Sequence, residues 1–289
     1  RMSPSLAKQI MTERNIATKM NHPFIQTLHR GFQDPTHIYF VATFAPRGDL
    51  YSCVTESVLS FQMAMFYFCE VVCGLGHLHQ NDIIHNDLKL ENVLVCDDGH
   101  VMLTDFGVSF HKTEESKIAG TPVYFAPEVI INKNKTFASD MWALGVMLFE
   151  LFCRRVRWQG KNHRLMFSLI IASNLSADYK ERTQEERHRV IETLLDLLCD
   201  HNHETRATCE SIQSHLVQEK IVDSWTIVKE KMLSPQYIPT PTRLTMNTID
   251  GFDFSVDKME QNLIDKMEQN LIGFPHKPDS LLCDRRREK

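Results

Sequence analysis

Three short motifs in a fixed order constrain this 289-residue chain more than any other feature of its sequence. The first is His85-Asn86-Asp87-Leu88-Lys89-Leu90-Glu91-Asn92, the second is Asp105-Phe106-Gly107, and the third is Ala126-Pro127-Glu128. Each motif alone is a weak signal. Polar residues that merely cap a loop would not explain all three motifs in this order. The set therefore requires one common explanation.

The polar residues of these motifs are the types that phosphoryl transfer requires. That reaction needs a carboxylate to orient the attacking hydroxyl, metal ions to neutralise the phosphates, and ligands for those metals. Asp87 fits the first role, and Asn92 and Asp105 offer the hard oxygen ligands that magnesium prefers. Lys89, two residues after Asp87, can reach the transferred phosphate. The order and spacing of the motifs predict a protein kinase.

The pattern of apolar residues around the motifs predicts an α+β chain. Residues 4–20 fit one helix with a single buried face, which must end before Pro23. Two strand-like runs at 25–32 and 37–44 predict a hairpin. Residues 61–80 are apolar nearly all round, which predicts a helix buried on most sides. Further elements are expected as strands at 93–96 and 101–104 and as helices at 138–153, 163–173, 184–199 and 206–218.

Residues 5–235 resemble the AGC group of serine/threonine protein kinases, typified by the cyclic-AMP-dependent kinase. Besides the three motifs, the supporting segments are 21–25 (NHPFI), 120–128 (GTPVYFAPE), 140–145 (DMWALG), 223–225 (DSW), 237–239 (YIP) and 252–254 (FDF). The lysine that follows Asp87-Leu88 is typical of serine/threonine kinases, whereas tyrosine kinases usually carry other residues there. The resemblance implies a protein-kinase-like fold with a truncated small lobe (helix C plus a β-hairpin) at 1–46. A mainly helical large lobe at 47–222 and an AGC-like C-terminal extension and irregular tail at 223–289 would follow.

The same resemblance implies ATP and Mg²⁺ as cofactors and assigns roles to single residues. The implied catalytic residues are Asp87, Lys89 and Thr121, and the implied metal ligands are Asn92 and Asp105. The implied nucleotide-binding residues are Ala42, Thr43, Ala45, Asp49, Glu91, Leu94, Thr104 and Phe252.

Structural roles follow from the resemblance as well. Glu13 would be the helix-C glutamate that pairs with the ATP lysine. Glu128 would pair with Arg206, and Asp140 would hold the backbone of the catalytic loop. A column of stacked side chains would run through Ala17, Leu28, His85 and Phe106.

The chain departs from the family pattern first at its beginning. It starts just before the helix of Glu13, and it contains no GxGxxG motif and no lysine-bearing strand upstream. Two explanations stay open: a fragment or truncated gene model of an active enzyme, and a pseudokinase that acts as a non-catalytic protein-binding module. We expect the chain as written to be inactive. The unpaired edge of the strand at 37–44 would expose backbone groups that attract another chain.

Three further departures are single residues. Asn86 stands where many kinases carry an arginine that receives a phosphate from the activation loop. The usual acceptor position holds Lys117, so both halves of that switch are missing, although Thr113 and Ser116 lie nearby. Ala42 would leave the adenine pocket unusually deep. Ala17 is small for its place in the column and should loosen helix C.

The partners follow from charge and from the resemblance. A formal net charge of −5 gives no reason to expect nucleic-acid binding, and no run of eighteen apolar residues predicts a membrane span. Asp49, Glu91 and Glu150 would line the peptide groove, which predicts protein substrates that are basic before the acceptor. A protein partner could bind the small-lobe edge or the tail, where DKMEQNLI at 257–264 recurs at 265–272. The scattered cysteines, without a CxxC pair, indicate a cytoplasmic or nuclear protein.

Overall fold

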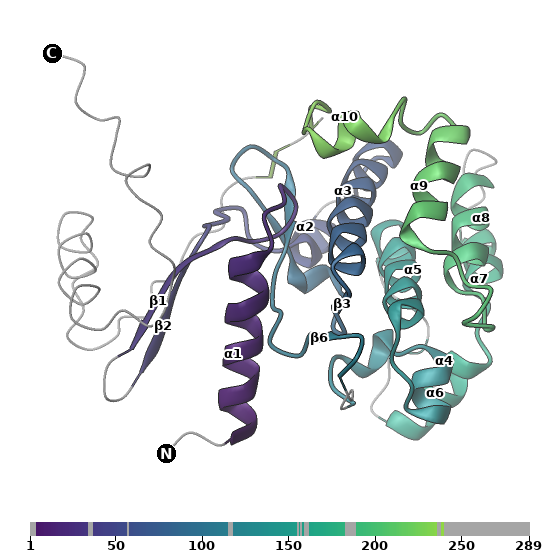
Figure 1. Ribbon diagram of the computed structural model, residues 1–289. Coiled ribbons are helices and arrows are strands. Elements are labelled where there is room, and N and C mark those ends of the chain that lie inside the picture. Colours follow the sequence, from purple (N-terminus) through teal and green to yellow (C-terminus); the bar gives the residue numbers. More distant parts are fainter. Residues whose placement is uncertain are drawn as a thin grey trace, which may run out of the picture. The chain divides into compact units, whose positions relative to one another are not determined.

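The computed structural model describes residues 4–33, 37–56, 58–114, 118–154, 156, 158, 162–182, 189–235 and 238–239. The chain divides into two compact units. One comprises Arg1–Thr27 with Phe44–Arg243, and the other comprises Leu28–Thr43 with Leu244–Lys289. The first unit contains every helix of the described residues, and the second contains a hairpin (Figure 1).

The hairpin of the second unit consists of β1 (Leu28–Gln33) and β2 (Ile38–Ala42) in antiparallel pairing. Gly31 lies opposite Phe40 and Phe32 lies opposite Tyr39, and the rings of Phe32 and Tyr39 stack with their centroids 4.8 Å apart. Such aromatic cross-strand pairs stabilise a two-stranded sheet. The predicted hairpin is therefore present, with each strand shorter than the apolar run that indicated it.

The first unit begins with α1 (Pro4–Lys19), whose last turn carries the buried residues Ile16 and Ala17. Pro23 lies just beyond its end, as the sequence predicts. The next residue, Phe24, is completely buried, and Ile25 bridges to Leu103. This chain segment thereby connects α1 to the core of the first unit.

Two long apolar helices, α3 (Phe61–Gln80) and α5 (Phe137–Cys153), contact each other in that core. Ser60 caps α3 by accepting a hydrogen bond from the Met63 N–H at 3.2 Å. Thr136 and Ser139 form a capping box at the start of α5. By length and composition α3 is the one helix of the described residues that could cross a membrane, but 83% of its most apolar window is buried inside the protein. Such burial is typical of a core helix.

Smaller elements surround these two helices (Figure 1). The short strands form two antiparallel pairs, β3 (Ile83–Ile84) with β6 (Phe110–His111) and β4 (Val93–Val95) with β5 (Val101–Leu103). The 3₁₀ turns are η1 (Leu90–Asn92) and η2 (Pro122–Tyr124). The remaining helices are α2 (Leu50–Glu56), α4 (Pro127–Asn132), α6 (His163–Ile171), α7 (Leu175–Arg182), α8 (Arg189–Leu198), α9 (Cys209–Gln218) and α10 (Trp225–Lys229).

The fold class is α+β and mostly helical, as the sequence predicts. The helix predicted at 61–80 has those bounds in the structure, and the one predicted at 206–218 begins at Cys209 because Thr208 caps it. The elements α2, α4, α7, α10, β3 and β6 did not follow from periodicity. Tyr237, Phe252 and the repeat at 257–272 lie outside the described residues.

Candidate active site

The first motif comprises the loop that follows β3 together with η1, and a side chain of α5 binds the backbone of this loop. The Asp140 carboxylate accepts hydrogen bonds from the backbone N–H of His85 at 2.8 Å and of Asn86 at 2.9 Å. His79 Nε2 lies 2.9 Å from the same carboxylate. Burial by itself would raise the pKa of Asp140, but the contacts with His79 and the loop bring it below its ordinary value. The predicted role of Asp140 in holding the catalytic-loop backbone is confirmed.

Asp87 lies at the centre of a compact polar cluster. Its carboxylate accepts a hydrogen bond from the Thr121 N–H at 2.7 Å and lies 2.9 Å from Lys89 Nζ. Lys89 Nζ also donates to Thr121 Oγ1 at 2.8 Å, so these three residues contact one another. Burial alone would raise the pKa of Asp87, yet the hydrogen bonds from Lys89 and Thr121 bring it below its ordinary value. The carboxylate is therefore ionised at neutral pH.

Asn92 contacts this cluster, and Asp105 follows a residue that is hydrogen-bonded to Asn92. The Asn92 side-chain amide donates to the Asp87 backbone oxygen at 2.8 Å, so its side-chain oxygen is not used in this contact. The Thr104 N–H donates to the Asn92 carbonyl at 3.0 Å and joins the strand before Asp105 to the loop. Asp105 has φ of 63°, a left-handed conformation that Asp and Asn tolerate better than most residues.

This donor set fits magnesium rather than a metal that is held by protein ligands alone. The described residues contain no group of three or more His, Cys, Asp or Glu side chains that could hold a metal ion. Magnesium keeps several waters and is usually bound through one or two protein oxygens together with substrate phosphates. One amide oxygen from Asn92 and one carboxylate from Asp105 match that requirement.

Two of the predicted nucleotide-binding residues, Asp49 and Leu94, lie side by side at β4. Asp49 bridges to Leu94, and the Val95 N–H donates to the Gly48 carbonyl at 2.9 Å. The backbone before α2 thereby runs along β4. Asp49 also accepts a hydrogen bond from the Ser52 N–H at 2.8 Å, which fixes the first turn of α2.

The other predicted nucleotide-binding residues are more scattered. Thr104 Oγ1 donates to Gln26 Oε1 at 2.6 Å, Ala45 is half-buried, and Glu91 is exposed. Ala42 and Thr43 belong to the hairpin unit, where Thr43 Oγ1 lies 3.0 Å from His29 Nε2. Phe252 lies outside the described residues.

Glu13 of α1 points toward the second motif. A Cβ placed on Gly107 would lie 3.9 Å from Glu13 Oε2 and 3.4 Å from Asp105 Oδ1. Burial and the nearby Asp105 carboxylate raise the pKa of Glu13. Within the described residues Glu13 has no lysine in ion-pair contact. Burial and the nearby carboxylate therefore both disfavour the ionised form of Glu13.

The predicted groove acids differ from one another in the structure. Asp49 is half-buried and Glu91 is exposed, but Glu150 is only 1% exposed. The Tyr124 hydroxyl donates a hydrogen bond to the Glu150 carboxylate. Burial, together with the nearby Glu91, raises the pKa of Glu150 to about 7. The expectation that all three acids face a substrate is therefore corrected: Glu150 is enclosed by its own chain.

The predicted pair of Glu128 and Arg206 is confirmed. Arg206 donates to the two carboxylate oxygens of Glu128 at 2.7 and 3.0 Å, and its side chain is fully buried. The same guanidinium donates to the carbonyls of Ala138 and Asp200 and lies 5.2 Å from the ring of Trp142. This pair joins the third motif to the loop before α9.

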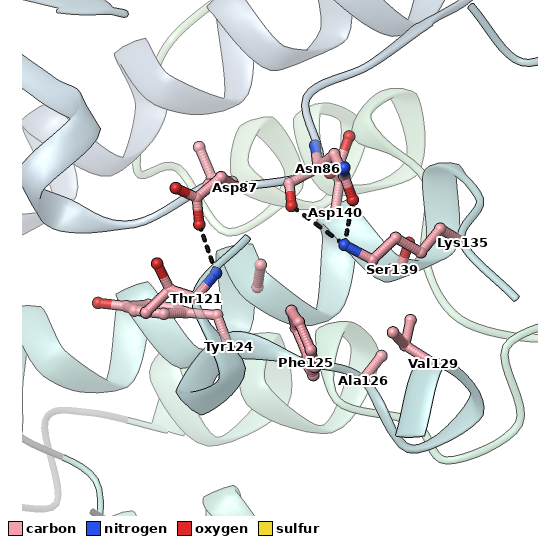
Figure 2. Close-up of a pocket in the computed structure, with 12 residues that line it drawn as sticks. Asn86, Asp87, Thr121, Tyr124, Phe125, Ala126, Val129, Lys135, Ser139 and Asp140 are labelled. Atoms are coloured by element: carbon pink, nitrogen blue, oxygen red, sulfur yellow. Dashed lines mark hydrogen bonds between the residues drawn. The ribbon is translucent and has the colours of Figure 1, made fainter. Parts of the chain in front are cut away.

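Sequence reasoning missed one residue of this region, Lys135. Figure 2 shows it beside Asn86 and Asp140, in a pocket that Asp87, Thr121 and Phe125 also line. The sequence did contain a signal, because Asn86 replaces an arginine and a compensating cation was a reasonable expectation. Lys133 and Lys135 are equal candidates in the sequence, and only the fold distinguishes them.

Comparisons with known proteins agree with this geometry. A model of the protein kinase domain matches residues 1–217. Protein kinase 3 of Dictyostelium discoideum is 32% identical over 251 residues, which cover 81% of this chain and 27% of that protein. Ribosomal protein S6 kinase alpha-1 of Rattus norvegicus is 32% identical over 237 residues, which cover 78% of this chain and 31% of that protein.

A third relative is the serine/threonine-protein kinase akt-1 of Caenorhabditis elegans, 35% identical over 191 residues that cover 64% of this chain and 35% of that protein. The matched regions thus span about a third of the length of these relatives. S6 kinases and Akt kinases are members of the AGC group, and protein kinases use ATP and Mg²⁺. The motifs, the polar cluster around Asp87 and these matches together show that the chain belongs to the protein kinase domain family and is similar to its AGC serine/threonine kinases.

Proposed function

We propose that this protein transfers the γ-phosphate of ATP to a serine or threonine hydroxyl of protein substrates. The observation that carries the proposal is the cluster of Asp87, Lys89 and Thr121, in which an ionised carboxylate is held by two donors. Asp87 would orient the substrate hydroxyl and take its proton while the new oxygen–phosphorus bond forms. The bond between the γ-phosphorus and the bridging oxygen breaks, and ADP leaves.

The other residues of the site would place the phosphates. Magnesium, when bound, neutralises phosphate charge, and Asn92 and Asp105 would hold it through their side-chain oxygens. Lys89 would lie against the transferred phosphate while keeping its contact with Thr121. Leu94 and Ala45 would contact the adenine, and Thr104 would lie beneath it.

Two matched asparagine variants test this proposal in protein purified from cells. Asp87→Asn removes the carboxylate, and phosphate transfer from labelled ATP should fall by about 10² to 10⁴. Asp82→Asn is the control, because Asp82 pairs with Lys112 and lies 3.9 Å from His111 on the surface, and its φ of 61° is one that asparagine tolerates. Equal activity of the Asp87→Asn variant and the wild type would refute the assignment.

We also propose that substrates are basic before the acceptor residue. The support is the exposed Glu91 together with Asp49, while Glu150 contributes only when it is released from Tyr124. A peptide library should show a preference for arginine or lysine, and Glu91→Gln should reduce it. The control is Glu56→Gln, because Glu56 is an exposed glutamate of α2. This variant should leave the preference for arginine or lysine unchanged. A preference for acidic residues in the wild type would contradict the proposal.

The second candidate function is a non-catalytic module that binds other proteins. It is favoured by Glu13, which has no lysine in ion-pair contact within the described residues. β2 pairs with β1 and with no other strand of the described part, so its second edge could accept a strand from a partner.

Two measurements separate the candidates. The 289-residue chain expressed alone should transfer negligible phosphate and should self-associate through the β2 edge. Val41→Lys, which puts a charge on that edge, should lower the mass measured by light scattering. Robust transfer by the chain alone, abolished by Asp87→Asn, would overturn the expectation of inactivity and would exclude the non-catalytic candidate.

A further inference from the structure

We propose that Lys135 is a positioning residue that holds segment 118–126 against the catalytic loop, in place of a phosphate added to the activation loop. The inference rests on the proposed function only for its kinetic consequence. Its structural content stands on the contacts of one buried lysine. Lys135 lies in the short connection between α4 and α5, directly before the cap residue Thr136.

One ammonium group joins two segments that are far apart in the sequence. Lys135 Nζ donates hydrogen bonds to the Asn86 side-chain oxygen and to the Ala119 carbonyl, and it lies 3.5 Å from the Asn86 carbonyl (Figure 2). An ammonium has three donors and no acceptor, so these three oxygens match its full capacity. Asn86 belongs to the catalytic loop and Ala119 to segment 118–126. Lys135 therefore bridges the two.

The surroundings of Lys135 are those of a structural cation rather than of a surface lysine. The residue is 7% exposed, and Nζ lies 4.7 Å from the centroid of the Phe125 ring. The carboxylates of Asp140 and Asp87 favour its protonated form. Burial, the larger effect, lowers the pKa of Lys135 to about 8, which still leaves the ammonium predominantly charged at pH 7.

The conformation of Asn86 directs its side-chain oxygen toward Lys135. Its backbone has φ of 71°, and its side-chain amide donates to the Val108 carbonyl at 2.8 Å, which leaves the side-chain oxygen for Lys135. The short side chain is thus engaged on both sides. It has neither the charge nor the length with which an arginine binds phosphate in two hydrogen bonds.

The two segments also approach each other too closely for another side chain between them. Gly120 has φ of 98°, and a Cβ at this position would lie 2.5 Å from the Asn86 carbonyl oxygen. The next residue, Thr121, donates its N–H to Asp87. By holding Ala119, Lys135 therefore fixes the backbone two residues before the contact with the proposed catalytic carboxylate.

Amide hydrogen exchange measured by mass spectrometry tests the proposal without relying on activity. Lys135→Met keeps most of the apolar stem and removes the charge and its donors. Exchange in 118–126 and in the loop at 85–87 should become about tenfold faster or more, while α3 and α5 keep their protection. The control is Lys133→Met, because Lys133 is exposed and lies two residues away. It should change neither region.

Two results would overturn the proposal. One is unchanged exchange in 118–126 of the Lys135→Met variant. The other is an equal rise throughout α3 and α5, which would make Lys135 a contributor to global stability only. If Lys135→Met does not fold, Lys135→Gln provides the same comparison with a neutral polar side chain.

Kinetics separate this inference from the proposed function. In active protein, Lys135→Met should lower kcat about tenfold to a hundredfold and leave the KM for ATP unchanged, because the geometry of the reacting groups is disturbed and nucleotide contacts are not. Phosphatase treatment of the wild type should leave kcat unchanged, and a large fall would contradict the proposal. A wild type without transfer activity would refute the proposed function, whereas the exchange measurement would still decide the role of Lys135.

Discussion

Removal of Glu128 should be among the most damaging single changes to the stability of this fold. The Arg206 side chain is fully buried and makes four hydrogen bonds, two to Glu128 and one each to the carbonyls of Ala138 and Asp200. Glu128→Ala removes two of these bonds and leaves the guanidinium charge buried. Hydrogen bonds to charged groups contribute about 1.5–3 kcal/mol each. Removing one partner of a buried ion pair costs about 3–5 kcal/mol. The loss expected from the two hydrogen bonds and the loss expected from the broken ion pair therefore agree.

Urea unfolding followed by circular dichroism measures this loss. With a denaturant slope of about 3 kcal/mol per M, the midpoint of Glu128→Ala should fall by roughly 1–1.7 M. The exposed Glu210→Ala, in the first turn of α9, is the control and should change the midpoint little.

A double variant distinguishes a buried charge from lost packing. Glu128→Met with Arg206→Met removes both charges, and its loss of stability should be smaller than the sum of the two single losses. A loss below about 1 kcal/mol for Glu128→Ala, or a double variant whose loss equals the sum, would refute the reasoning.

Three further outcomes are expected. Gly145→Ala should cost about 1–3 kcal/mol of unfolding free energy, because a Cβ there would overlap Cys199 Sγ, and adding Cys199→Ala should restore part of the loss in the same urea assay. Burial, then the nearby His77 and Lys229, lowers the pKa of His22 from 6.5 to about 4. As the pH falls, His22 therefore takes up a proton in the unfolded chain before it does so in the folded one. The free energy of unfolding should fall by up to about 3 kcal/mol between pH 6.5 and 4. His22→Asn should show a shallower fall over that interval. Ala42→Met should weaken the thermal-shift response to a purine inhibitor with a bulky substituent, and an equal response would show that Ala42 does not deepen the adenine pocket.

The sequence was sufficient for those parts of the fold in which a local pattern decides the outcome. Helix α3 has its predicted bounds because twenty mostly apolar residues follow a serine that can cap them. The three motifs identified the loop that carries Asp87 and the pairs that surround it, because these residues occupy the same places in related kinases. The strands β3 and β6, with two residues each, and the helix α4, with six, carry too few residues for a periodicity to be visible.

Side-chain burial was the part that the sequence could not supply. Glu150 was expected to line an open groove and Lys135 had no predicted role, yet the structure encloses Glu150 behind Tyr124 and Lys135 behind Phe125. Whether a charged side chain is buried depends on which segments, distant in the sequence, pack over it. Neither residue spacing nor composition predicts that packing. The roles of Asp87, Asn92 and Asp105 in catalysis and metal binding remain predictions that the proposed assays address.

Under the proposed preference for basic peptides, the enclosure of Glu150 would couple peptide binding to the release of a proton. With a pKa of about 7, this carboxyl group carries a proton in a large fraction of molecules at neutral pH. A substrate arginine that reached it would displace the Tyr124 hydroxyl and favour the ionised form. Binding would then expel a proton into solution, so the affinity for basic peptides would increase as the pH rises through neutrality. A modest change in cellular pH would act on substrate choice through a residue that solvent hardly reaches.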